Sequence, residues 1–286
     1  MSGVTTICFA ASYAVALLLE ISRLVFRSGV RRIVMIGFAA AGLVAHSAFL
    51  YYHATGPDGL PLSSEQGWYL LAAWLLVVVY LYLAVCLPRQ AFGVFLLPLV
   101  LLLIGVATFV ASPEPNLRAP ASKIWGIVHG TSILLATVII LFGMVTGVMY
   151  LVQARRLKHK RPPIRGFLLP SLEWLQRANG GAIVLSVVFL AVGVFSGLIL
   201  NRLRGTGTMD WRDPVVAGTL IMFLWLIGAM LVSRFYEPAQ AGRKVALLTV
   251  ISFVFLVVML GVGFWLDTSH GMSSPPVNRI EETINQ

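Results

Sequence analysis

Residues 124–158, IWGIVHGTSILLATVIILFGMVTGVMYLVQARRLK, decide the fold class. From residue 124 to residue 154 this stretch contains no Asp, Glu, Lys or Arg. As a helix rising about 1.5 Å per residue, it is longer than the roughly 30 Å hydrocarbon core of a bilayer. The stretch therefore predicts a transmembrane helix that tilts or protrudes, and the densest basic run of the chain, residues 155–165, follows it.

Apolar runs of this kind recur along the whole chain of 286 residues, which is 58% hydrophobic and only 11% charged. They are too continuous for the alternating strands of a membrane barrel, and a lipid-embedded backbone must satisfy its own hydrogen bonds. The sequence therefore predicts an all-α, polytopic helical membrane bundle, a single domain over residues 1–286. Its eight transmembrane helices are expected at residues 4–26, 33–52, 67–87, 91–111, 124–154, 182–200, 215–235 and 245–266. Residues 171–179 are expected as a separate amphipathic stretch on the surface, and residues 267–286 as a loose polar tail.

The distribution of basic residues orients this bundle. The net charge of +10 would indicate nucleic acid in a soluble protein, but cytoplasmic loops of membrane proteins are themselves rich in Lys and Arg, so we expect no nucleic-acid partner. Six of the 21 basic residues fall on one side of an eight-helix topology: Arg118, Lys123, Arg202, Arg204, Arg212 and Arg279. The other 15 fall on the opposite side. That side is predicted to be cytoplasmic, with both termini outside.

Charged residues crowd at the predicted outer edge in residues 201–214, NRLRGTGTMDWRDP. His129 lies about one turn inside the outer end of the fifth helix, and His270 lies just past the eighth. Two neutral imidazoles can take both axial positions of a haem iron, so these histidines predict an outward-facing haem. No CxxC motif is present for covalent attachment, and the haem is therefore expected to be non-covalent, of the b type.

The same loop offers partners for the rest of a haem. Arg202, Arg204 and Arg212 are candidates to pair with the propionates, and Trp211 to stack on the porphyrin. Each of these residues also has an ordinary role open to it in a membrane protein without haem. A histidine at a helix end is often an interfacial residue, an aromatic belt accounts for the tryptophan, and the arginines have Asp210 and Asp213 as alternative partners.

His46 is predicted within the second helix, in its outer third, and His53 follows seven residues later on nearly the same face. The two histidines are candidates for a ladder that leads outward. The alternative is that His46 hydrogen-bonds a neighbouring helix and that His53 is a loop residue.

At these residues the chain resembles the haem-handling cytochrome c assembly proteins of the CcsA/ResC and HemX type. The segments that carry the resemblance are residues 45–53 (AHSAFLYYH), 124–158, 169–197 (LPSLEWLQRANGGAIVLSVVFLAVGVFSG) and 260–271 (LGVGFWLDTSHG). The resemblance implies that His129 and His270 are the external axial ligands and that His46 belongs to an intramembrane haem site. Asp213 and Pro214 match the end of the family's tryptophan-rich signature.

The chain also departs from that pattern. Arg212 stands where the signature has a Trp, and Val215 and Val216 replace its closing Lys-Glu pair. No His occurs near Val232 or Ser233, where the second intramembrane ligand is expected. We therefore expect His46 to tune or relay rather than to ligate stably.

The resemblance implies a haem-handling protein of cytochrome c biogenesis in the bacterial cytoplasmic membrane. It would present haem at the outer face for attachment to apocytochrome c, with a CcsB/ResB-like membrane partner. Whether such a chain counts as part of an enzyme is left open. Two alternatives also stay open: a HemX-like regulator of haem biosynthesis, and a small-molecule transporter that uses none of these histidines as ligands.

Overall fold

The computed structural model describes residues 5–23, 29–55, 64–113, 123–160, 168–203, 213–235 and 238–265. Within these ranges the chain forms eight helices and no strand longer than an isolated bridge. In order they are α1 (Thr6–Ser22), α2 (Gly29–Thr55), α3 (Glu65–Cys86), α4 (Gly93–Phe109), α5 (Lys123–Lys158), α6 (Leu172–Leu203), α7 (Pro214–Phe235) and α8 (Pro238–Trp265).

Six of the eight helices are long and apolar enough to cross a membrane. The other two, α1 and α4, have 17 residues each, which is the lower limit for a span. Large apolar side chains point outward along the bundle, with Phe109 87% and Phe235 81% exposed, as expected where lipid is the solvent. The predicted all-α, multi-pass membrane bundle is confirmed.

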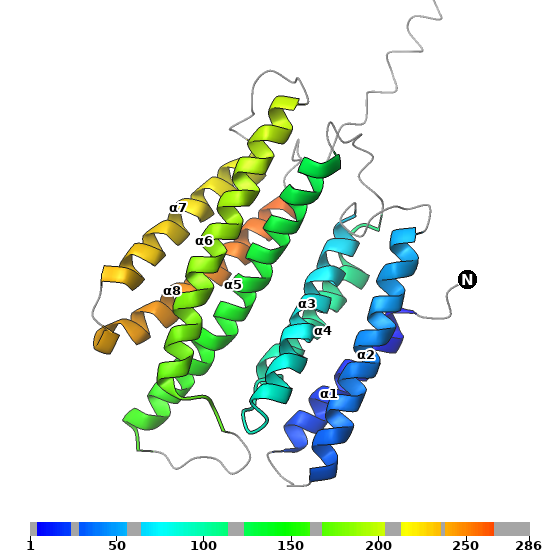
Figure 1. The fold of residues 1–286 in the computed structure, drawn as a ribbon, viewed down its shortest axis with the longest axis vertical. Helices are drawn as coiled ribbons and strands as arrows, with labels where there is room; N and C mark the ends of the chain where they lie inside the picture. The colour runs from blue at the N-terminus through cyan, green and yellow to red at the C-terminus, as the bar shows by residue number, and fades with distance from the viewer. Residues whose placement is uncertain are drawn as a thin grey trace, which may run out of the picture.

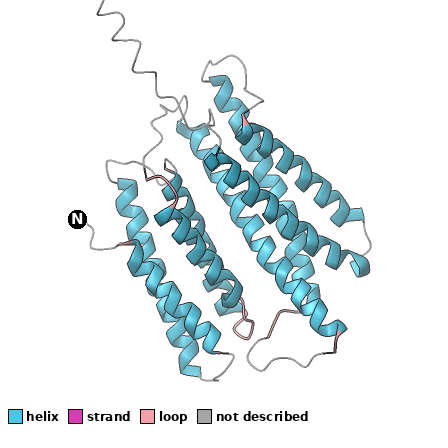
Figure 2. Cartoon of the chain, turned by 180° about the vertical axis from the view of Figure 1, so that it is seen from behind, coloured by secondary structure: helices cyan, strands magenta, loops and turns pink. Residues whose placement is uncertain are grey.

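The helices form two groups of four that lie side by side (Figure 1; Figure 2 shows them from behind). In the first group α1 packs on α2 and α4, and α3 packs on α2 and α4. In the second group α5 packs on α6 and α8, and α7 packs on the same two helices. The groups meet where α5 contacts α3 and α4. One continuous apolar core crosses this junction and includes the fully buried Tyr80, Leu96 and Met149.

Consecutive helices run in opposite directions, so the bundle has two ends. We call the end where α1, α3, α5 and α7 finish the Arg23 end, and the opposite end, where α5 and α7 begin, the His129 end.

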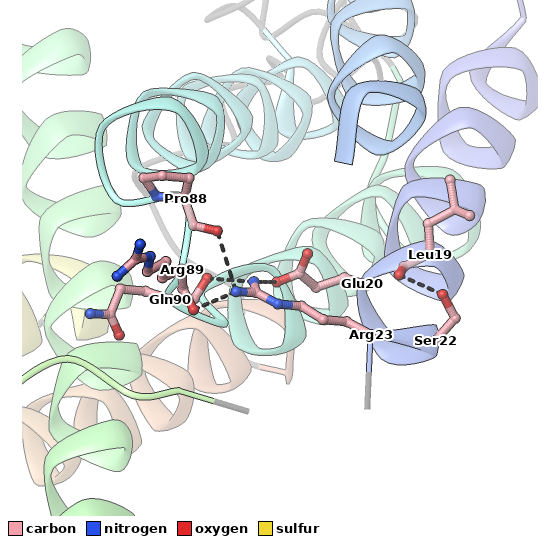
Figure 3. A network of polar contacts seen from close by, with 7 residues as sticks. All are labelled: Leu19, Glu20, Ser22, Arg23, Pro88, Arg89 and Gln90. Carbon is pink, nitrogen blue, oxygen red and sulfur yellow. Dashed lines mark hydrogen bonds and ion pairs between the residues drawn. The ribbon is translucent and has the colours of Figure 1, made fainter. Parts of the chain in front are cut away.

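At the Arg23 end, a buried charged pair fastens α1 to the turn between α3 and α4 (Figure 3). The Arg23 guanidinium donates to Glu20 Oε1 at 3.3 Å and to the backbone oxygens of Gln90 at 3.0 Å, Pro88 at 3.3 Å and Arg89. Glu20 is only 2% exposed. The guanidinium therefore satisfies a buried carboxylate and a row of carbonyl groups together.

The same turn joins the two groups of helices. The Ala91 N–H donates to the Leu168 carbonyl at 3.0 Å. With its nitrogen turned toward them, the Gln90 side-chain amide donates to the carbonyls of Leu168 at 3.1 Å and Leu169 at 2.9 Å. Just beyond, the rings of Phe92 and Trp174 meet edge to face at 5.4 Å. These contacts hold the start of α6 against the start of α4.

The prediction of a separate surface stretch at residues 171–179 is wrong, because these residues lead directly into α6 and form its first turns. Ser171 caps the helix by accepting from the Trp174 N–H at 3.3 Å. Leu175 and Asn179 are fully buried, so this segment packs into the bundle and the helix continues through Gly180 and Gly181.

Candidate functional site

His129 lies near the start of α5 and is half-buried against α6. Its Nδ1 is 2.8 Å from the backbone oxygen of Gly193. Since a carbonyl can only accept, Nδ1 carries the proton, and in this tautomer of the imidazole the lone pair is on Nε2. Metal-binding histidines are held in this way, with one ring nitrogen donating to a fixed acceptor and the other left to the metal.

Two glycines on α6 make room for this ring. A Cβ atom at Gly197 would lie 3.0 Å from His129 Cε1 and 3.1 Å from Nδ1. A Cβ atom at Gly193 would lie 2.5 Å from Ile133 Cδ1, one turn further along α5. The absence of side chains at these two positions lets α5 approach α6 closely enough for the imidazole to reach a backbone carbonyl. The role of Gly193 and Gly197 was not predicted, although the sequence shows their Gly-x-x-x-Gly spacing, which places both on one face of α6.

The loop with the candidate arginines begins and ends at the His129 end of the bundle. Arg202 is exposed in the last turn of α6, nine residues after Gly193, or about 13 Å along the helix. Arg204, Trp211 and Arg212 lie outside the described residues, as does His270. The structure therefore places one of the three predicted propionate partners.

Asp213 ends the loop and is only 4% exposed. Its Oδ1 accepts from the backbone N–H groups of Val215 at 2.9 Å and Val216 at 3.4 Å. With Pro214 as the first helical residue, this is the usual arrangement of an acidic N-cap followed by proline. Asp213 therefore fixes where α7 starts, and its place in a haem site remains a prediction.

The register of α8 brings its end to the level of His129. A Cβ atom at Gly147 on α5 would lie 2.9 Å from the backbone oxygen of Ala246 on α8, and the two helices run antiparallel. His129 is 18 residues before Gly147, and 18 residues after Ala246 the chain reaches Phe264. Equal rise along both helices thus sets the last turn of α8 level with His129. His270 follows Trp265 by five residues in the sequence.

His46 is fully buried between α1 and α2. The Phe9 ring stacks on it at 4.1 Å and an interplanar angle of 2°, and the Tyr13 hydroxyl is 3.3 Å from its Nδ1. Its Nε2 has no hydrogen-bond partner in the described part of the chain. His46 thus hydrogen-bonds a neighbouring helix, as the alternative interpretation expected.

Two phenylalanine rings connect His46 and His53, and a role of the two histidines as a ladder stays a prediction. Phe9 contacts Phe49 edge to face at 5.6 Å, and Phe49 stacks on the His53 ring at 4.1 Å. His53 belongs to the last turn of α2 rather than to a loop.

The structure separates His46 from the other candidate residues. Among the described helices, α2 contacts only α1 and α3. It does not reach α5, which carries His129, or α7, which carries Val232 and Ser233. His46 and His129 therefore lie in different groups of helices. The described helices do not bring a second intramembrane ligand to His46.

Comparison with known proteins identifies the family of the chain. No curated protein matches it significantly. The family model described as cytochrome C assembly protein matches residues 62–270. The match covers α3 to α8, together with His129, the loop after Arg202, Asp213 and His270, and it begins after α2 and His46. Because the match spans well over half of the chain, this protein belongs to the cytochrome C assembly protein family.

Proposed function

We propose that this protein binds haem at the His129 end of the bundle and presents it for attachment to apocytochrome c. Membership of the cytochrome C assembly family supports a role in cytochrome c biogenesis. The observation that carries the proposal is the 2.8 Å contact between His129 Nδ1 and the Gly193 carbonyl. It holds the imidazole in one tautomer and leaves Nε2 available as a ligand.

Each candidate residue has a distinct part in this proposal. When bound, haem would supply an iron that two neutral imidazoles can ligate. His129 would bind this iron through Nε2, and His270 is proposed as the second ligand, since α8 ends level with His129. The arginines at 202, 204 and 212 are proposed to pair with the propionates, because a guanidinium matches a carboxylate with two parallel hydrogen bonds. Trp211 is proposed to stack on the porphyrin, and Asp213 anchors the end of the loop that carries these residues.

The proposal also includes the orientation of the protein in the membrane and its partners. The excess of basic residues at the Arg23 end favours a cytoplasmic location for that end, and haem would then be held on the opposite face of a bacterial cytoplasmic membrane. Haem would be bound without covalent bonds, as cargo for apocytochrome c, and a CcsB/ResB-like membrane protein is the proposed partner.

A second candidate is a HemX-like membrane regulator of haem biosynthesis, which would bind haem without passing it on. The observation that favours it is the reduced tryptophan signature. Only residues 211–214 match its end, and Val215 and Val216 occupy the first turn of α7 where a Lys-Glu pair is expected.

Visible absorption spectra of the detergent-purified protein test haem binding. The wild type is expected to show a Soret band with low-spin α and β bands. His129→Ala or His270→Ala should lose haem or become mostly high-spin, and added imidazole should restore the low-spin spectrum by filling the vacated position. His159→Ala, in the turn after α5, serves as the matched control. If both site variants keep full haem and an unchanged spectrum, these histidines are not the ligands.

Covalent haem staining of c-type cytochromes in cells separates the two candidate functions. A biogenesis protein whose His129 is replaced should leave the cytochromes without haem. If staining stays normal while the purified variant has lost its haem, the protein does not deliver haem and the regulator is favoured.

A further inference from the structure

The carbonyl group that holds His129 has a second side-chain donor. The Ser196 hydroxyl oxygen lies 2.9 Å from the backbone oxygen of Gly193 and 2.7 Å from that of Val192. Serine side chains within helices donate in this way to carbonyls three or four residues earlier. Ser196 is buried, with 1% of its surface exposed. Its single hydroxyl hydrogen is therefore shared between these two carbonyls.

The Gly193 oxygen thus faces more donors than it can satisfy equally. The hydrogen-bond pattern of the α-helix brings it the N–H of Gly197. The Nδ1–H of His129 approaches the same oxygen at 2.8 Å. A carbonyl oxygen has two lone pairs, so a third donor has to share one of them. The helix fixes the backbone donor, and the Ser196 hydroxyl therefore competes with the His129 ring.

The strength of the bond from His129 to Gly193 affects the ring nitrogen on the other side. When Nδ1–H donates strongly, the imidazole gains imidazolate character and Nε2 becomes more basic. A more basic axial ligand stabilises ferric over ferrous haem iron, so a strong hydrogen bond at Nδ1 lowers the midpoint potential of the haem. A competing donor at the shared carbonyl has the opposite effect.

We propose that Ser196 is a positioning residue that weakens the hydrogen bond between His129 and Gly193, and so limits the strength of His129 as a haem ligand. The hydroxyl acts through the shared carbonyl. A ligand of limited strength suits a site that delivers haem instead of retaining it. The link between Ser196 and His129 depends on the protein alone, whereas its effect on haem rests on the function proposed above.

Solid-state nuclear magnetic resonance of the full, haem-free chain in nanodiscs tests the link. Labelling with ¹³C,¹⁵N-histidine and ¹³C-valine assigns the ring without a mutation, because His129 alone of the five histidines follows a valine. Ser196→Ala should move the Nδ1 signal of His129 downfield, since Nδ1–H no longer shares its acceptor with a hydroxyl and its proton is drawn further toward the Gly193 oxygen. An unchanged or upfield signal would overturn the proposal.

Two further variants separate the hydroxyl from packing in general. Ser186→Ala removes another serine of α6 that is 1% exposed, seven residues or about 10 Å before Gly193, and should leave the His129 signals unchanged. Ser196→Thr keeps the hydroxyl, and α5 already holds Thr146 with its hydroxyl 3.1 Å from each of two carbonyls of its own helix. This variant should keep the wild-type signal. A downfield shift in either variant as large as that of Ser196→Ala would count against a role of the hydroxyl.

Redox potentiometry of the haem-loaded protein extends the test to the iron. Ser196→Ala should lower the midpoint potential below that of the wild type, Ser186→Ala and Ser196→Thr, because the stronger ligand favours ferric iron. An unchanged potential in Ser196→Ala would refute the effect on the ligand, even with a shifted Nδ1 signal. A wild-type protein that takes up no haem would refute the proposed function instead, and the nitrogen signals of the haem-free protein would still decide the link between Ser196 and His129.

Discussion

Replacing Arg23 with alanine tests whether the buried charged pair holds the first helix to the bundle. The substitution leaves the Glu20 carboxylate, whose side chain is 3% exposed, without its ion-pair partner. It also removes the donor to the carbonyls of Pro88, Arg89 and Gln90. Breaking a buried pair by removing one partner costs about 3–5 kcal/mol. We expect Arg23→Ala to lower the free energy of unfolding by about that amount.

The chain provides a matched control for this change. Arg177 also pairs with a glutamate on its own helix, at 2.5 Å from Glu173, but the two side chains are 78% and 74% exposed. Exposed pairs of this kind contribute about 0–1 kcal/mol, so Arg177→Ala should have little effect. Adding Glu20→Gln to Arg23→Ala removes the unpaired charge, and this double variant should recover part of the lost stability.

The assay is unfolding of the purified protein by SDS in bicelles, followed by tryptophan fluorescence. Equal costs for Arg23→Ala and Arg177→Ala would refute the argument, because burial would then make no difference to the value of the pair. Failure of Glu20→Gln to relieve Arg23→Ala would show that the lost carbonyl contacts dominate.

Three further predictions concern the candidate site and the orientation of the bundle. Gly197→Ala should displace the His129 ring and lower haem content several-fold in the visible spectrum, whereas Gly181→Ala on the same helix, with no atom within 4 Å of the added Cβ, should not. If both variants keep the wild-type haem content, haem does not bind at the His129 ring. His46→Ala should lower haem content less than loss of either His129 or His270, since α2 does not contact the helix of His129; an equal loss would point to a second ligand. A C-terminal reporter that is active only in the cytoplasm should be inactive, and activity would reverse the proposed orientation of the bundle.

The number of helices and their approximate positions were predictable, because long apolar runs separated by charged loops have few other solutions in lipid. The ends were harder to predict. The sixth helix was predicted to start after the Gly180-Gly181 pair, whereas α6 begins at Leu172. Glycines weaken a helix, but burial of Leu175 and Asn179 against the bundle outweighs that local preference. The eighth helix was predicted to start at residue 245, whereas α8 begins at Pro238, a residue that suits the first position of a helix.

The candidate site was predictable only in part. His129 was found because a histidine in an apolar run is unusual, but its acceptor is a backbone carbonyl, and no side chain in the sequence marks that contact. The role of Asp213 as the cap of α7 was visible in the Asp-Pro pair, although these residues were interpreted as the end of the family's signature. The separation of His46 from α5 and α7 depends on which helices are neighbours in space, and periodicity along one helix does not determine this.

The first two helices form a hairpin that precedes the part of the chain matched by the family model. A hairpin crosses the membrane twice and returns the chain to the side on which it started. The six helices from α3 onward therefore enter the bilayer from the same face with or without this hairpin. A pair of helices, of which α2 carries His46, can therefore precede such a unit while the end that carries His129 stays on the same side of the membrane.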